Sequence, residues 1–123
     1  MERCRPTKNR FPNGMKPVAD HIHSLGMKAG IYTDAGNNTC GSIWDNDHAG
    51  VGAGIYGHEQ QDAQLYFSAL GYRLIKIDYC GGDVLGLNEQ ERYTSIRNSI
   101  DKVTRTSLST SAVGLFPAHG QRM

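Results

Sequence analysis

A unit in which an amphipathic helix ends at a glycine and is followed at once by a short apolar strand occurs twice in this chain. In the first copy, apolar residues recur at helical spacing between residues 14 and 25, Gly26 ends the helix, and residues 27–34 fit a strand. The second copy has its helical stripe over 63–70 and its strand over 72–78. Nearly continuous apolar strands are typical of parallel sheets that are covered on both faces. We therefore predict an α/β fold.

A third helix is expected after Asn88, whose side chain can cap it while Glu91 reaches back. This helix would bury four apolar side chains, those of Tyr93, Ile96, Ile100 and Val103. The pattern fails beyond Thr104, and although residues 107–116 could form another strand, nothing after them could cover the sheet. A sheet with only two clear strands has unpaired edges and an unfinished core, so we expect a fragment of a larger fold.

Length and composition exclude several classes of protein. The 123 residues are far fewer than the roughly 200 that a closed (β/α)₈ barrel needs. With 38% hydrophobic residues, 20% charged residues and a net charge of +1, the chain resembles an ordinary globular protein and lacks the basic footprint of a nucleic-acid binder. No run of 18 apolar residues exists, and the first residues lack the apolar core of a signal peptide. We expect neither nucleic acid nor a membrane as partner.

The three cysteines are too few for a disulfide-built miniprotein, and no C-x-x-C pair suggests zinc. One disulfide and one spare thiol is the simplest interpretation, with three reduced thiols as the alternative. The histidines are scattered, and His21 and His23 stand two apart on a predicted helix, where they face different directions. The sequence therefore predicts no metal site and no cofactor.

The strongest site signal is the pair Lys76 and Asp78 at the end of the second predicted strand. Alternation places both side chains on one face, and the carboxyl ends of parallel strands are where α/β folds place their chemistry. An ionised Asp78, held charged by the neighbouring ammonium group, would be a carboxylate nucleophile. The alternative is a buried structural ion pair.

A second motif, Gly52–Gly57, matches the dinucleotide fingerprint G-x-G-x-x-G, with Asp78 about 20 residues further on. That fingerprint requires an apolar strand leading into its first glycine. Residues 44–50 are polar and turn-like instead, so a nucleotide-binding module is the less favoured interpretation.

Three segments together, FPNGMKPVADHIHSLGMKAGIYTDAGNNTCGS, YGHEQQDAQLYFSALGY and LIKIDYCGG, resemble glycoside hydrolase family 27, the α-galactosidases and relatives such as β-L-arabinopyranosidases. The resemblance spans about residues 10–104. It implies that residues 1–104 are part of a TIM (β/α)₈ barrel, about two to three βα units around strands 3 and 4, with 105–123 an unassigned tail. The family's enzymes are cytoplasmic or secreted.

The resemblance also implies roles for individual residues. Asp78 would be the catalytic nucleophile, Lys76 a hydrogen-bond donor to the sugar, and Tyr32 and Cys40 part of the galactose pocket. Cys40 and Cys80 would form a disulfide that leaves Cys4 as the spare thiol. Two further aspartates, Asp34 and Asp62, match recurrent positions but receive no catalytic role.

Two elements of the family's machinery are not found in this sequence. The aspartate motif of the early strands would lie upstream of Met1, and the acid/base aspartate of a later strand is missing. The expected function is therefore that of a fragment of a retaining α-galactosidase-type enzyme, inactive alone, with a galactoside or related carbohydrate as the family's substrate. A non-catalytic carbohydrate-binding or structural remnant is the alternative.

Overall fold

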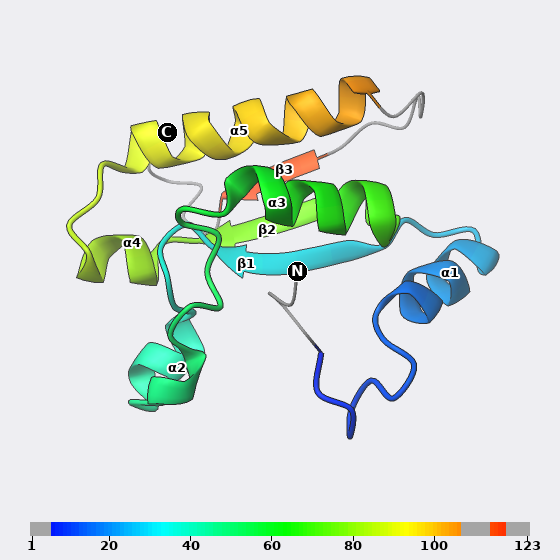
Figure 1. The fold of residues 1–123 in the computed structure, drawn as a ribbon, viewed down its shortest axis with the longest axis horizontal. Coiled ribbons are helices and arrows are strands. Elements are labelled where there is room, and N and C mark those ends of the chain that lie inside the picture. Colours follow the sequence, from blue (N-terminus) through cyan, green and yellow to red (C-terminus); the bar gives the residue numbers. More distant parts are fainter. Residues whose placement is uncertain (1–5, 107–113, 118–123) are drawn as a thin grey trace.

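The computed structural model describes residues 6–106 and 114–117, and it contains a parallel sheet of three strands (Figure 1). The strands are β1 (Gly30–Asp34), β2 (Leu74–Asp78) and β3 (Gly114–Pro117), in the order β1-β2-β3. Both pairings are parallel. The predicted α/β class and the parallel pairing of the first two strands are thus confirmed.

Helices connect the strands. They are α1 (Lys16–Ser24), α2 (Cys40–Trp44), the 3₁₀ turn η1 (His48–Gly50), α3 (Glu59–Ala63) with its π-helical continuation η2 (Gln64–Ala69), α4 (Cys80–Val84) and α5 (Glu89–Thr106). Within the described ranges, none of these helices combines the length and apolar character that a membrane span requires.

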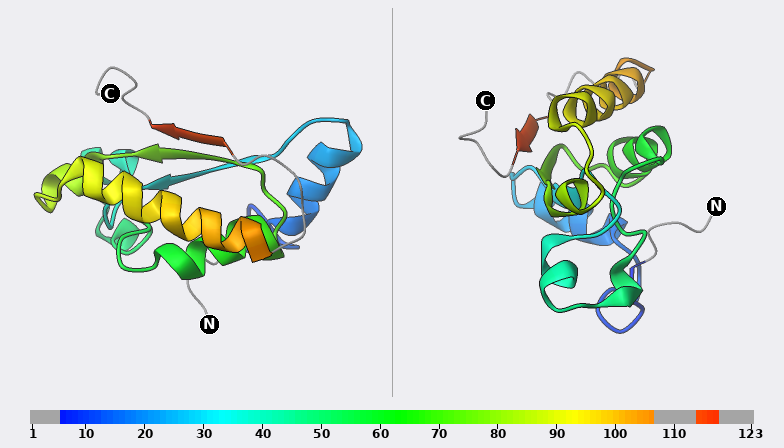
Figure 2. Two further views of the ribbon diagram at one scale, coloured as in Figure 1. Left: turned by 90° about the horizontal axis from the view of Figure 1, so that it is seen from above. Right: turned by 90° about the vertical axis from the view of Figure 1, so that its left-hand side faces the viewer.

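The helices α3 and α5 pack on the same face of the sheet (Figure 2). Ile75 and Ile77 of β2 point into this layer and are fully buried. Their partners from α5 are the apolar side chains Ile96, Ile100 and Val103, all buried as expected for that helix. Burying a large apolar side chain contributes about 1.5–3 kcal/mol, so this layer holds the main core.

The opposite face of the sheet is open over the described residues, which contradicts the expectation of cover on both faces. Strand register pairs Tyr32 with Lys76 and Asp34 with Asp78. Because paired residues of parallel strands point to the same side, these polar side chains share the face opposite Ile77. Tyr32 is 40% exposed there. The open face therefore carries Tyr32 and Lys76, with the largely shielded Asp78 and the buried Asp34 at its carboxyl edge.

Several element bounds differ from the sequence expectations. The strands begin later, at Gly30 and Leu74, and the helix expected over 63–70 begins at Glu59 and then widens into a π-helix. The positive φ of Gly26 confirms the predicted helix stop. The possible strand over 107–116 is present in its last part, because Gly114–Pro117 forms a strand that extends the sheet beside β2.

Candidate active site

Asp78, Tyr32 and Lys76 come together on the open face at the carboxyl ends of β1 and β2. The Tyr32 hydroxyl donates a hydrogen bond of 2.6 Å to Asp78 Oδ2. The Lys76 ammonium lies 4.0 Å from Asp78 Oδ1 and 5.8 Å from the centre of the Tyr32 ring. One carboxylate oxygen is thus fixed by a neutral donor, and the other faces a cation at longer range. The sequence prediction that Lys76 and Asp78 share a face is confirmed.

The alternative of a buried structural ion pair does not hold. The Lys76 side chain is 60% exposed, whereas that of Asp78 is 14% exposed. An exposed ammonium at 4.0 Å contributes little to stability, because water screens the attraction. The pair is instead an accessible cation next to a largely shielded carboxylate, which suits the binding of a polar ligand better than the support of a core.

Tyr32 remains a neutral hydrogen-bond donor over the whole physiological pH range. Partial burial, followed by the hydrogen bond to Asp78 and the negative charge of that carboxylate, raises the pKa of the Tyr32 phenol well above its usual range. A phenol that keeps its proton continues to orient Asp78 Oδ2. The Asp78 Oδ1 atom is then the oxygen left to meet an electrophile on the open face.

Asp34 links the loops that follow the two strands, a role that sequence reasoning did not assign to it. Its side chain is fully buried, and Oδ1 accepts hydrogen bonds from the N–H groups of Gly36 at 2.7 Å and Gly81 at 3.1 Å. Burial raises the pKa of Asp34 against the opposing effect of these two bonds. The N–H of Ala35 also donates to the Asp78 carbonyl at 2.9 Å, so both strand ends are held in one register.

A disulfide joins Cys40, at the start of α2, to Cys80, at the start of α4, as the resemblance implied. The Cα atoms are 5.1 Å apart and the residues are 40 positions apart in sequence. The disulfide therefore joins the segment that follows β1 to the segment that follows β2, at the edge of the sheet where Asp78 lies. Cys4 lies outside the described residues.

The glycine-rich segment over 52–57 is a loop, as expected from the absence of an apolar strand before it in the sequence. No strand leads into it, because η1 precedes it and α3 follows. A side chain at Gly54 would place its Cβ 2.0 Å from the carbonyl oxygen of Gly36, so the two backbones are in direct contact. This loop packs on the turn after β1 and helps to fix the rim of the site.

A buried ion pair behind the site was not predicted. The Arg92 guanidinium of α5 binds the Glu59 carboxylate of α3, and its Nε–H donates to the Ala35 carbonyl at 3.0 Å. The same guanidinium lies 4.6 Å from the centre of the Tyr56 ring. Arg92 therefore ties both covering helices to the residue that follows β1, directly beneath the polar cluster.

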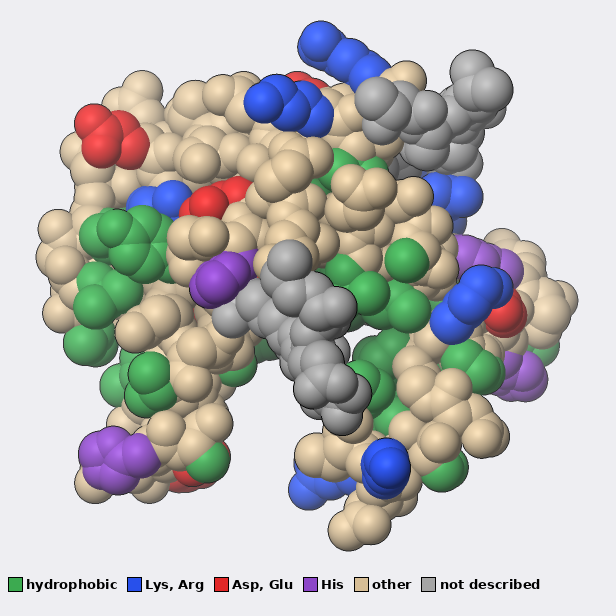
Figure 3. Space-filling model, in the orientation of Figure 1, with side chains coloured by type: hydrophobic (Ala, Val, Ile, Leu, Met, Phe, Trp, Pro, Cys, Tyr) green, Lys and Arg blue, Asp and Glu red, His purple; other side chains and the backbone are tan. Residues whose placement is uncertain are grey.

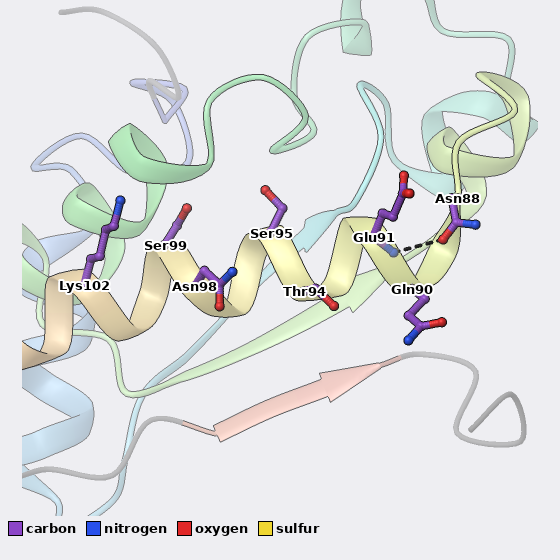
Figure 4. Close-up of a pocket in the computed structure, with 8 residues that line it drawn as sticks. All are labelled: Asn88, Gln90, Glu91, Thr94, Ser95, Asn98, Ser99 and Lys102. Atoms are coloured by element: carbon purple, nitrogen blue, oxygen red, sulfur yellow. Dashed lines mark hydrogen bonds between the residues drawn. The ribbon is translucent and has the colours of Figure 1, made fainter.

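Two grooves on the surface of the described residues lie away from Asp78. One, of about 690 Å³, runs along α5 and is lined by polar side chains, with Glu91 its single carboxyl group (Figure 4). The other, of about 260 Å³, is apolar and lies between the segment that precedes α1 and the helix η2, with Phe11, Met15 and Ile31 among its lining residues. Hydrophobic side chains are visible around this hollow on the surface (Figure 3).

Comparisons with known proteins agree on one family. The chain matches the family model described as "Alpha galactosidase A" over residues 1–121. It is 40% identical over 101 residues to alpha-galactosidase A of Cellvibrio japonicus, a match that covers 82% of this chain and 22% of that protein.

Solved structures resemble the chain in the same way. Alpha-galactosidase I from Mortierella vinacea superposes with a TM-score of 0.68 and 29% identity, over 94% of this chain and 28% of that one. The alpha-galactosidase from Saccharomyces cerevisiae solved with raffinose gives a TM-score of 0.66 and 27% identity, over 90% and 22%. The chain spans about a fifth of the length of the curated relatives it matches.

Proposed function

The chain belongs to the alpha-galactosidase A family, glycoside hydrolase family 27, and we propose that it supplies two to three βα units of that family's (β/α)₈ barrel, around strands 3 and 4. Parallel strands with helices on one face support this arrangement, since barrel helices lie outside and the inner face carries side chains toward the axis. The open face with Tyr32, Lys76 and Asp78 would then be the barrel interior, and its carboxyl edge the catalytic end.

The proposed reaction is retaining hydrolysis of a terminal α-galactosyl or closely related glycosidic bond. The Asp78 carboxylate attacks the anomeric carbon, a carbon–oxygen bond to the enzyme forms, and the glycosidic bond breaks. The leaving oxygen takes a proton from a general acid, and water then cleaves the ester with the same group acting as base. The observation that carries this proposal is the hydrogen bond between Tyr32 and Asp78 Oδ2, which orients the carboxylate and leaves Oδ1 for attack.

The neighbouring side chains have distinct proposed tasks. The exposed Lys76 ammonium is placed to donate hydrogen bonds to sugar hydroxyls, because it lies at the carboxylate yet remains accessible. Tyr32 would line the sugar pocket beside it, and Cys40 would contribute the wall of that pocket through the disulfide. That a yeast relative was solved with raffinose supports a carbohydrate as the substrate class.

The second carboxyl group of a retaining site is expected from elsewhere in a complete barrel. Asp34 is the nearest acid along the paired strand, but it is fully buried and its Oδ1 is bound by two backbone N–H groups. A carboxyl group buried and held in that way is not free to protonate the leaving-group oxygen, as the general acid of a retaining site must. We therefore expect the isolated chain to be inactive on aryl α-galactosides.

The test is a hybrid barrel, in which the aligned segment of a full-length relative is replaced by that of this chain. Turnover of an aryl α-galactoside should be abolished by Asp78→Asn and unchanged by the control Asp83→Asn, because Asp83 is exposed on α4. An amide is a poor nucleophile, so Asp78→Asn activity above about a hundredth of the parent would contradict the proposal. An inactive but folded parent hybrid would favour a carbohydrate-binding or structural remnant.

A further inference from the structure

A group of three metal-ligating side chains lies at the same edge of the sheet, and none of them makes or breaks a bond in the proposed hydrolysis. A carboxylate oxygen of Asp34 and the sulfur atoms of Cys40 and Cys80 all lie within 4.8 Å of one another. The residues come from three different elements: the end of β1, the start of α2 and the start of α4. In the structure the two sulfur atoms are joined in the disulfide.

Only one of the two carboxylate oxygens of Asp34 is used to hold the neighbouring loops. Asp34 is 0% exposed, and its Oδ2 atom is buried without a hydrogen-bond partner among the described residues. Buried polar atoms in native proteins are normally satisfied, so an orphaned carboxylate oxygen next to two sulfur atoms needs an explanation. A cation would provide the missing partner.

The other oxygen of Asp34 is already fixed. Oδ1 accepts from the N–H groups of Gly36 and Gly81, which sets the plane of the carboxylate. Hydrogen bonds of this kind orient metal-binding carboxylates in known sites. The position of Gly81 is equally constrained, because a Cβ there would lie 2.7 Å from Asp34 Oδ1. The carboxylate is therefore held in place before any ion arrives.

We propose that, when the Cys40–Cys80 disulfide is reduced, Asp34, Cys40 and Cys80 bind one zinc ion. A thiol reductant supplies two electrons and two protons, so the disulfide becomes two cysteine thiols and the reductant becomes a disulfide. Zinc then replaces both thiol protons, which pass to solvent. Two thiolates and a carboxylate are ligands that zinc favours, and water would complete the tetrahedron.

Geometry and charge both support this assignment. The Cα atoms of the two cysteines are 5.1 Å apart, and each sulfur would need to move only a short distance to make a bond of about 2.3 Å to a shared ion. Two thiolates beside the Asp34 carboxylate would place three negative charges in a shielded position, which is unfavourable unless a cation is bound. The disulfide and the zinc site are thus alternative states of one cluster, selected by the reducing power of the surroundings.

The experiment uses the full 123-residue chain with Cys4→Ser, so that only the two cysteines of the cluster remain. The protein is reduced with a phosphine, freed of reductant without oxygen, and titrated with Co²⁺ as a spectroscopic substitute for zinc. We expect one equivalent to give a thiolate-to-cobalt charge-transfer band and the visible bands of tetrahedral cobalt, both removed by Zn²⁺. Cys40→Ala should halve the charge-transfer band, since its strength follows the number of thiolates.

The variant Asp34→Asn should weaken Co²⁺ affinity on the order of ten-fold or more, while the matched Asp83→Asn should leave it unchanged. The oxidised chain should give no band. Three results would overturn the proposal: no band after reduction, the same band without reduction, or equal affinities for Asp34→Asn and Asp83→Asn. A chain that unfolds on reduction would give this last result, because the thiolates of an unfolded chain bind cobalt without help from Asp34. Unfolding on reduction would therefore also overturn the proposal.

Discussion

Removing the positive charge of Arg92 is expected to destabilise the fold more than any change at the surface. Arg92 is 8% exposed, and the Glu59 side chain that it binds is 15% exposed. The substitution Arg92→Met keeps the volume of the side chain but leaves the Glu59 carboxylate charged and shielded from water. It also removes the donor to the Ala35 carbonyl.

Breaking a buried ion pair by removing one partner costs about 3–5 kcal/mol. This is a large share of the roughly 5–15 kcal/mol that stabilises an ordinary domain. The exposed pair of Lys16 and Asp20 provides the control, because its atoms are also within hydrogen-bond distance, at 2.9 Å, but its side chains are 60% and 56% exposed. Lys16→Met should cost no more than about 1 kcal/mol.

The assay is urea unfolding of the 123-residue chain at pH 7, followed by far-ultraviolet circular dichroism, with sucrose present to strengthen burial. With slopes of about 1–3 kcal/mol per molar urea, Arg92→Met should lower the midpoint by at least about 1 M. Adding Glu59→Gln to Arg92→Met should recover part of the loss, because no stranded charge then remains. Equal midpoints for Arg92→Met and Lys16→Met would refute the reasoning.

Three further predictions concern pH, packing and the disulfide. Burial alone would raise the pKa of Glu59, but hydrogen bonds from its own N–H, Arg92 and Gly57 lower it below 4.5. The contribution of the ionised Glu59 carboxylate to the free energy of unfolding is therefore present above pH 4.5 and is lost as the pH falls through the lowered pKa. Glu59→Gln should remove this loss, so the free energy of unfolding should fall less steeply on the acid side. Gly81→Ala should lower the urea midpoint, because its Cβ would lie 2.5 Å from the Asn38 carbonyl oxygen, whereas Gly41→Ala meets open space and should be neutral or stabilising. Cys80→Ser should cost about 3–4 kcal/mol by opening a 40-residue loop, and Cys4→Ser should cost nothing; a midpoint lowered as much by Cys4→Ser would contradict the pairing.

The parts of the fold that follow from local rules could be predicted from the sequence. Gly26 ends its helix because only a residue that tolerates positive φ fits there, and Asn88 caps α5 by accepting from the Glu91 N–H at 2.9 Å. Lys76 and Asp78 share a face because the strand repeat is two residues. Each of these depends on neighbours a few residues apart.

The parts that were missed depend on contacts between distant segments. The third strand was only a possibility within residues 107–116, and its bounds at Gly114–Pro117 follow from its pairing with β2. The π-helical turn ends with a hydrogen bond from the Leu70 N–H to the Leu65 carbonyl, five residues back, a spacing that the α-helical periodicity of the sequence did not indicate. Arg92 finds Glu59 across 33 residues and Ala35 across 57 residues, separations that no periodicity encodes. An arginine on the otherwise apolar face of a predicted helix was the available signal.

The central claim is that Asp78 is the residue that bonds to the sugar. The most direct measurement is covalent labelling of the hybrid barrel with a fluorinated galactosyl fluoride, which needs little help from a general acid to form the glycosyl-enzyme and hydrolyses slowly from it. Peptide mass spectrometry should find one sugar on the peptide that contains Asp78, and none after Asp78→Asn. A sugar attached to a different carboxylate, or steady turnover of the probe by the Asp78→Asn variant, would contradict the account.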